Sequence, residues 1–303
     1  MKDMPSHHGP KTEMKGEYPN ATIKLLVERA SCRTFQDKEI PEDVMQVLFE
    51  VATHAATGGN LQPYSIIKIT EKKTREKMAD WCEQSFIGTA PVNLLFCIDW
   101  YRNKRWAELY DAPFSASSSF RHFWISFQDT IIAAQNICTA ADALGLGSVY
   151  IGTVLEFFRE FRDLFELPEG VFPVVFLSLG YPKGELRMRR KLATEYIVHD
   201  EKYHRYTDEE ILAAFEGKYP EVKIQITPER LDTFKEVCRV VGGDKFAEKC
   251  LDRVNRQGYI NMPQRYFGLH YKADIMPVGN EEYLKIFEES GFGWFKRWEK
   301  EPG

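Results

Sequence analysis

The sequence lacks the features of a membrane or nucleic-acid-binding protein. No apolar run approaches the ~20 residues that a membrane-spanning helix needs, and residues 1–18 contain no apolar core of the kind found in signal peptides. The formal net charge is −5, with 40 Lys and Arg against 45 Asp and Glu. No positive excess therefore favours nucleic acid or an anionic membrane, and we expect a protein that binds neither.

Cysteine is scarce, and no two cysteines have the C-x-x-C spacing typical of iron–sulfur and zinc sites. We therefore predict no metal. Most of the cysteines lie in apolar segments such as 94–98, so we interpret them as small buried side chains in a reducing, cytoplasmic compartment. The six are Cys32, Cys82, Cys97, Cys138, Cys238 and Cys250.

Signatures of side-chain catalysis are missing as well. The sequence contains no nucleophile elbow, P-loop or kinase motif. Asp142 and Glu166 have no evident partner carboxylate, which argues against a hydrolase that works with a carboxylate pair. His199 and His204 have no third ligand at metal-binding spacing, so we interpret them as ordinary polar residues.

What the sequence does contain is a succession of apolar patterns, with 44% hydrophobic residues in 303, enough to bury a large core. We predict an α+β core followed, after about residue 217, by a helical extension. Helices are predicted to begin at Thr22 and at Pro41, after Thr227, and at a cap formed by Asp244. Further helices are predicted over 74–83, 123–144, 155–165, 208–215 and 280–290. Strands are predicted over 64–70, 92–99, 148–151 and 172–179, and residues 100–120 show no clear period.

Arg29 and Arg33 flank Ser31 at the end of the first predicted helix. If the helical turn persists, their i, i+4 spacing points both guanidinium groups at one ligand. Two arginines and a hydroxyl suit a phosphate and an electron-rich ring edge. The alternative is a solvated basic turn paired with Glu28 or Asp37.

Three further segments offer binding groups. Residues 58–64 (GGNLQPY) combine glycines that permit close backbone approach with the donors and acceptors of Asn and Gln, and a plain loop is the alternative. Residues 145–152 (GLGSVYIG) lack the strand-first context of a dinucleotide fingerprint. Residues 186–191 (LRMRRK) gather cations that favour a nearby anion, unless the segment is a solvated loop.

In this order and spacing, the motifs resemble the nitroreductase family of FMN-dependent oxidoreductases. The resemblance covers roughly residues 22–206 and rests on R-x-S-x-R at 29–33, N-x-Q-P-Y at 60–64, G-L-G-S-x-x-I-G at 145–152 and L-G-Y-P at 179–182, followed by a basic cluster. It implies a mixed β-sheet flanked by helices, in an intertwined homodimer with two FMN sites. Residues 56–59 (ATGG) and Tyr64 depart from the frequent Pro-Ser and Trp of relatives.

The resemblance also implies roles for single residues. Arg29 and Ser31, with Ala30 between them, would hold the FMN phosphate or ribityl chain. Arg33 would lie near the N1/O2 edge of the flavin and the Gly152 amide near N5, and these two are the predicted catalytic residues. The other predicted cofactor-binding residues are Thr57, Gly58, Asn60 and Gln62 from the partner subunit, Tyr150, Ile151 and Thr153 beside Gly152, and Arg187 and Arg189 at the phosphate, with Arg190 left as an alternative.

The implied activity is a ping-pong reaction. NAD(P)H would deliver hydride and leave before a small acceptor, such as a nitroaromatic, quinone or enone, is reduced. Two alternatives stay open: a reductive dehalogenase or flavin-fragmenting relative whose lid is the 100–120 segment, and a non-catalytic flavin-binding protein. The predicted domains are a flexible tail (1–20), an FMN-binding core (21–216) and a helical extension (217–303) that acts as a lid or dimer clamp.

Overall fold

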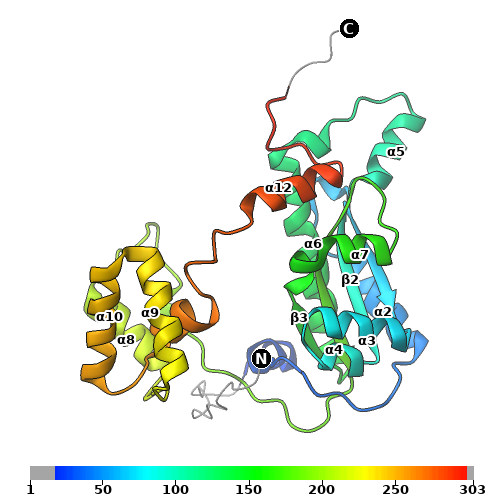
Figure 1. The fold of residues 1–303 in the computed structure, drawn as a ribbon. Helices are drawn as coiled ribbons and strands as arrows, with labels where there is room; N and C mark the ends of the chain where they lie inside the picture. Colours follow the sequence, from blue (N-terminus) through cyan, green and yellow to red (C-terminus); the bar gives the residue numbers. More distant parts are fainter. Residues whose placement is uncertain (1–17, 299–303) are drawn as a thin grey trace. The chain divides into compact units, whose positions relative to one another are not determined.

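The computed structural model describes residues 18–298, and these form two compact units. The first unit comprises residues 18–188 and 282–298, and the second comprises residues 189–281. Figure 1 labels the main elements of each. The predicted tail, residues 1–20, lies mostly outside the described residues. No helix within 18–298 has the length and apolar character required to cross a membrane.

The first unit contains four strands and most of the helices. The strands are β1 (Tyr64–Ile69), β2 (Val92–Asp99), β3 (Gly147–Ile151) and β4 (Val171–Gly180). The helices are α1 (Ala21–Glu28), α2 (Glu42–Thr53), α3 (Lys72–Trp81), α4 (Phe86–Thr89), α5 (Tyr101–Leu109), α6 (Phe120–Ala143) and α7 (Phe158–Leu164), with short 3₁₀ turns η1 (Gly58–Asn60), η2 (Ala116–Ser118) and η3 (Thr153–Phe157).

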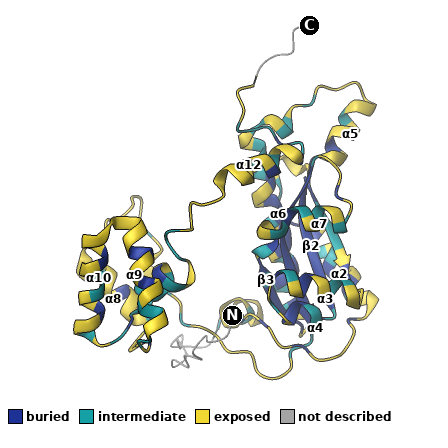
Figure 2. Cartoon of the chain, viewed as in Figure 1, coloured by how far each residue is buried: buried dark blue, intermediate teal, exposed yellow. Residues whose placement is uncertain are grey.

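The four strands form one antiparallel sheet in the order β1-β2-β4-β3. An α+β fold with helices around a sheet is therefore confirmed (Figure 1). The two central strands are buried along their whole length, as Figure 2 shows. This explains why their sequences are continuous apolar runs. β1 and β3 are the outer strands, and each leads to a different part of the predicted site.

The core lies on both faces of the sheet. Alternate residues of β2 point to opposite sides, so Leu94 and Phe96 pack with α2 and α6 on one face. Leu95 and Cys97 pack with α3 and α4 on the other. The register between β2 and β4 shifts between Phe96 and Cys97. The shift places Pro173, which has no N–H to donate, next to a bulge, where a sheet tolerates proline.

Helix α6 is the longest helix in the described chain and packs against the sheet and against α2. It begins three residues before the predicted start because the Ser119 side chain accepts a hydrogen bond from His122 N at 3.4 Å and caps it. It ends before Gly145, whose φ of +74° is the left-handed conformation of a helix stop. The cysteines behave as predicted: all six are free thiols, and five are buried.

Helix α5 was not predicted, because the 100–120 segment has no apolar period. The structure explains this: only Asn103 of α5 is buried, and Trp106 and Leu109 are largely exposed. A helix that buries almost no apolar face leaves no periodic signal in the sequence.

The second unit is helical, as predicted for this region. It contains η4 (Thr194–Tyr196), α8 (Asp208–Lys218), α9 (Pro228–Gly242), α10 (Asp244–Gln257), α11 (Met262–Arg265) and the π-helical turn η5 (Tyr266–His270). Its own small core includes Phe234, Val254 and Ile260. Thr227 caps α9 as predicted, accepting from Arg230 N at 3.3 Å. Asp244 is the first residue of α10 and not its cap, because Gly243 occupies the cap position.

The last helix, α12 (Asn280–Glu289), and the residues after it pack on the first unit. The Phe287 ring lies 4.5 Å from that of Phe172 in β4, and the Trp294 ring stacks 5.2 Å from that of Phe123 in α6. Arg159 of α7 holds this end by ion pairs to Glu282 and Glu289. The boundaries of the two compact units therefore differ from those of the predicted segments 21–216 and 217–303. The roles of these segments stay predictions.

Candidate functional site

The first group of predicted site residues follows α1. The helix ends at Glu28, and Arg29 already has φ −53° and ψ 131°. The expectation that Arg29 and Arg33 share a helical turn is therefore wrong. Residues 29–33 run extended instead, because no intrahelical bond continues past the cap and the chain pairs with β3.

In that extended segment, buried and exposed side chains alternate. The Cys32 N–H donates to the Ser148 carbonyl oxygen of β3 at 2.9 Å. Ala30 and Cys32 are buried, whereas Ser31 and Arg33 are exposed, because successive side chains of an extended chain point to opposite sides. Ser31 and Arg33 therefore share one exposed face, whereas the sequence spacing groups Arg33 with Arg29.

Arg29 is half-buried and engages three side chains. Its Nε donates to Cys138 Sγ at 3.0 Å, and its Nη2 donates to Ser148 Oγ at 3.3 Å. Its Nε also lies 3.5 Å from Asp142 Oδ2. Burial raises the pKa of Asp142 to about 6, and the positive charge of Arg29 opposes that rise. The guanidinium group is thus a positive charge held at the C-terminal end of α6.

Arg33 lies at the other end of the segment, with its Cζ 5.9 Å from the ring centre of Phe86 in α4. A guanidinium group over an aromatic ring is weakly attracted by the ring's negative face. Arg33 therefore presents positive charge at the surface, close to α4 and two residues from Ser31.

The edge strand β3 supplies the second predicted part. Gly147 is required where the 29–33 segment crosses, since a Cβ there would lie 2.5 Å from Cys32 Cβ. The Tyr150 hydroxyl donates to Gln135 Oε1 of α6 at 3.3 Å, and burial raises the pKa of Tyr150. Gly152 has the opposite surroundings from Gly147: a Cβ built on it meets no heavy atom within 4 Å.

Two neighbours of Gly152 differ in exposure. Ile151 is buried, with 1% of its surface exposed. This is a core position in the sheet, so it shapes the site from behind. Thr153 Oγ1 accepts a hydrogen bond from Gln84 Nε2 at 3.0 Å, which fixes the start of η3. The open side of Gly152 is therefore the place where a planar group can approach the β3 backbone.

The third predicted part is the η1 turn before β1. The Gly58 N–H donates to both carboxylate oxygens of Asp129 in α6, each at 3.1 Å. A Cβ on Gly58 would lie 2.6 Å from Ile125 Cγ2, so only glycine fits here without a shift. Burial raises the pKa of Asp129, and the Gly58 bond opposes the rise. Gly58 therefore anchors the turn to α6.

The rest of the turn is conformationally constrained. Asn60 and Gln62 have φ values of 55° and 47°, a left-handed conformation that is uncommon outside glycine. The Gln62 amide donates to Thr53 O at 2.9 Å, and Arg102 Nη2 donates to Gln62 O at 2.8 Å. Thr57 Oγ1 is buried and neither accepts nor donates a hydrogen bond within residues 18–298.

The predicted basic cluster divides between the two compact units. Arg187 belongs to the first unit and Arg189 to the second, and both are exposed. Arg190 Nη1 donates to Gly217 O at 3.2 Å within the second unit. Their roles at a phosphate stay predictions.

One chain does not bring all of these parts together. The η1 turn leads into β1, whereas Gly152 follows β3, and β1 and β3 are the two outer strands. Three strand spacings of ~4.8 Å separate them, about 14 Å of sheet width. The 29–33 segment and β3 therefore form one half-site, and the η1 turn forms another.

Sequence reasoning missed the residues that support these half-sites. Asp142 and Cys138 contact Arg29, and Asp129 holds Gly58. All three lie on α6, 71 or more residues from their partners along the chain. A buried acid in an otherwise apolar helix was the one available signal, because burying a carboxylate requires a partner.

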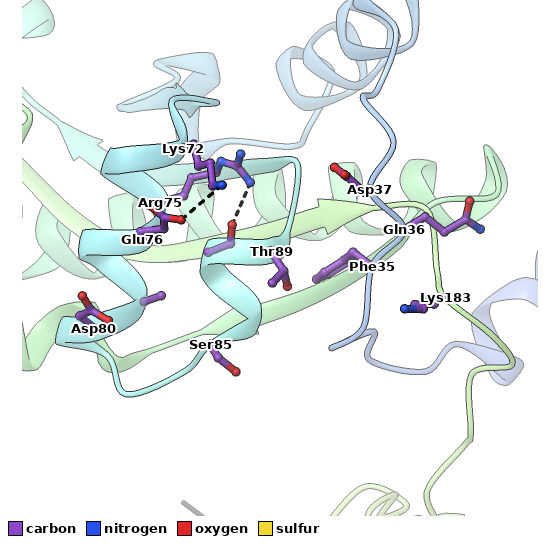
Figure 3. Close-up of a pocket in the computed structure, with 12 residues that line it drawn as sticks. Phe35, Gln36, Asp37, Lys72, Arg75, Glu76, Asp80, Ser85, Thr89 and Lys183 are labelled. Carbon is purple, nitrogen blue, oxygen red and sulfur yellow. Dashed lines mark hydrogen bonds and ion pairs between the residues drawn. The ribbon is translucent and has the colours of Figure 1, made fainter.

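A separate cleft of about 790 Å³ lies between α3, α4 and the 35–37 segment. Figure 3 shows Lys72, Arg75 and Glu76 on one side, and Asp37 and Lys183 on the other. Three of its charged residues have partners within the chain: Lys72 Nζ lies 3.8 Å from Glu76 Oε1, and Arg75 donates to the Gly88 carbonyl at 3.0 Å. None of the predicted site residues lines it.

Comparison with known proteins adds to this geometry. The sequence model of the nitroreductase family matches residues 26–181. A curated relative from Bacillus subtilis (strain 168), named FMN reductase (NAD(P)H), is 31% identical over 186 residues, which are 61% of this chain and 75% of that protein.

Two solved structures extend the likeness. A putative oxidoreductase from Bacteroides fragilis superposes with a TM-score of 0.73 at 28% identity, covering 89% of this chain and 99% of that one. Nitroreductase A from Vibrio parahaemolyticus superposes with a TM-score of 0.62 at 26% identity, covering 66% of this chain and 84% of that one. The first of these reaches well beyond residues 26–181.

Proposed function

Because the chain belongs to the nitroreductase family, we propose that it is an FMN-dependent oxidoreductase that takes hydride from NAD(P)H. One observation carries this proposal. Arg29, Ser31 and Arg33 follow one another on the segment paired with β3, and Gly152 leaves open space at the end of that strand. Cations and a hydroxyl beside an open, uncharged backbone suit a ligand that joins a phosphate to a planar ring.

The residues present fit FMN. Arg29 and Ser31 would hold the phosphate or ribityl chain, and the missing side chain of Gly152 would let the ring reach the backbone. Thr57 Oγ1, which is buried and makes no hydrogen bond among the described residues 18–298, would be available to a ligand at the other half-site. FMN, when bound, would supply the hydride chemistry, which requires no side-chain nucleophile.

The chain's own residues would orient the reactants and stabilise charge. Arg33 places positive charge at an exposed position, where it would favour negative charge that develops on the ring edge. The Gly152 backbone N–H would donate toward a ring nitrogen. After the oxidised nicotinamide leaves, a nitroaromatic, quinone or enone would enter the same place, in a ping-pong sequence.

We further propose a homodimer. The two half-sites lie at opposite edges of the sheet, so a second copy can bring the η1 turn of one subunit to the Arg29 segment of the other. An apolar surface is present to support it. Helix α1 buries no residue, and its Leu26 and Val27 are 47% and 44% exposed. On α6, Trp124 is 54% exposed and Phe127 is 40% exposed. Large exposed apolar side chains of this kind are typical of interaction surfaces.

Residues 217–303 are proposed to act as a lid or dimer clamp. Because 282–298 pack on the core, the informative variant replaces only residues 219–279 by a Gly/Ser linker, which keeps Arg189, Arg190 and the whole of α12. A broader acceptor range with retained FMN would favour the lid, and loss of the dimer would favour the clamp. Identical mass and kinetics would refute both roles. The free cysteines support a reducing, cytoplasmic location.

The cofactor proposal is tested on purified protein. We expect a yellow protein that releases FMN, and not FAD, on denaturation, identified by chromatography against standards. Oxidation of NADH or NADPH with a quinone or nitroaromatic then separates an enzyme from a flavin-binding protein without turnover. A colourless protein that does not bind added FMN would refute the assignment.

A further inference from the structure

Asp142 lies next to Arg29, but the two side chains are not joined by the hydrogen bonds of an ordinary ion pair. Its Oδ2 lies 3.5 Å from Arg29 Nε, yet this oxygen is buried and accepts no hydrogen bond within residues 18–298. The Nε–H donates instead to Cys138 Sγ at 3.0 Å. The carboxylate therefore neutralises the guanidinium group by charge alone, without the paired hydrogen bonds of a strong salt bridge.

The surroundings of Asp142 make its charge costly. Only 12% of its side chain is exposed, and burial raises its pKa to about 6. The titratable groups that act on this cluster are Arg29, the thiols of Cys32 and Cys138, and the Tyr150 hydroxyl. Burial raises the pKa of each of these thiols and of the hydroxyl, so they stay neutral near pH 7. Arg33 also acts on Cys32, and Arg29 is the cation that acts on Asp142.

We propose that Asp142 is a positioning residue that holds Arg29 in the empty site and yields it to a phosphate monoester by taking up a proton. The inference rests on the proposed FMN function, in which Arg29 binds the phosphate. A phosphate that reaches Arg29 brings up to two negative charges close to a carboxylate that already lacks a hydrogen bond. The two anions compete for one cation, and the less solvated of them is neutralised by protonation from solvent.

The sign of the resulting pH dependence follows. A bound phosphate raises the affinity of Asp142 for its proton, so binding takes up protons above pH 6, and FMN affinity falls as the pH rises through that range. If the bound phosphate strengthens proton binding at Asp142 about tenfold, FMN affinity falls by up to about tenfold across that range. The phosphate's own second ionisation, near pH ~6, works in the opposite direction, because the dianion binds a cation better. The two effects oppose each other in the wild type, and Asp142→Asn, which keeps only the second, separates them.

The experiment is isothermal titration of the flavin-free, full-length protein with FMN at pH 7, in two buffers with different ionisation enthalpies. We expect wild-type protein to take up protons on binding and, through Asp142, to lose about fivefold in affinity between pH 6 and pH 8. Asp142→Asn should abolish the uptake, and its affinity should stay level or rise with pH. Asp163→Asn, the same change at a carboxyl that is 74% exposed, should behave as wild type.

Riboflavin, which lacks the phosphate, should bind without proton uptake. Equal proton uptake by wild type and Asp142→Asn would overturn the proposal. If Asp142→Asn does not fold, the wild type decides alone, because an FMN affinity that stays constant or rises from pH 6 to pH 8 contradicts it. A wild type that binds no FMN at any of these pH values refutes the proposed function itself, and with it the role of Asp142.

Discussion

At the centre of the proposed site, Gly152→Ala distinguishes an effect on FMN binding from an effect on the stability of the protein. The backbone there has φ −92° and ψ −12°, a conformation open to alanine. A Cβ at this position meets no heavy atom of the chain within 4 Å. The folded protein therefore has room for the methyl group, and a bound flavin ring lying on the same backbone does not.

The two expected effects have opposite signs. Replacing a glycine by alanine at a compatible site stabilises a protein by about 0.4–1 kcal/mol, because the unfolded chain loses freedom. An extra methyl group forced into a filled contact costs about 1–3 kcal/mol, so FMN should bind about 5- to 150-fold more weakly. Gly152→Ala should thus keep or gain stability and lose cofactor.

The assay is a urea unfolding curve of the flavin-free protein, followed by FMN titration monitored by flavin fluorescence. Gly217→Ala is the matched control, because a Cβ on Gly217 in α8 also meets nothing within 4 Å. It should leave FMN affinity unchanged. An unchanged FMN affinity in Gly152→Ala would show that no ring lies against this backbone, and a loss of stability would show that the space is not open.

Three further outcomes are expected. Arg33→Ala should slow flavin reduction by NAD(P)H by up to about 10²-fold while weakening FMN binding less, and an unchanged rate in stopped-flow absorbance would remove Arg33 from the site. Leu26→Glu should lower the mass found by light scattering toward that of the monomer, because it places a charge on the apolar face of α1; a persistent dimer contradicts that interface. Asp142→Asn should raise the free energy of unfolding at pH 8 by at most about 3 kcal/mol and leave it unchanged below pH 4, because the native carboxyl, with a pKa of about 6, carries its costly charge only above that range. An equal gain at both pH values would point to packing.

Much of the fold could be predicted because its signals are local. β2 and β4 are continuous apolar runs in sequence and are buried at every position in the structure. Gly145 follows the helix predicted over 123–144, and Gly258 follows α10; both have left-handed backbones, with φ 74° and 75°. A helix stop or a buried strand is decided by a few consecutive residues, so its pattern survives in the sequence.

The grouping of the site residues was partly predictable, and its geometry was not. The R-x-S-x-R spacing predicts Arg29 and Arg33 on one helical turn, but an extended segment places Ser31 and Arg33 on one face instead. The pairing of Cys32 with Ser148 decides this. That bond joins residues more than a hundred positions apart, and no local preference encodes it.

By itself, the sequence determined which segments are apolar enough to form the sheet, where helices stop, and which motifs carry polar groups. Only the tertiary structure decided that Asp142 faces Arg29, that Asp129 holds the Gly58 turn, and that this turn and Gly152 lie at opposite edges of the sheet. The physical reason is that strand order and the docking of α6 are set by burial of the whole core. The partners of the carboxylates that this docking buries, Asp142 and Asp129, are therefore residues distant in the sequence.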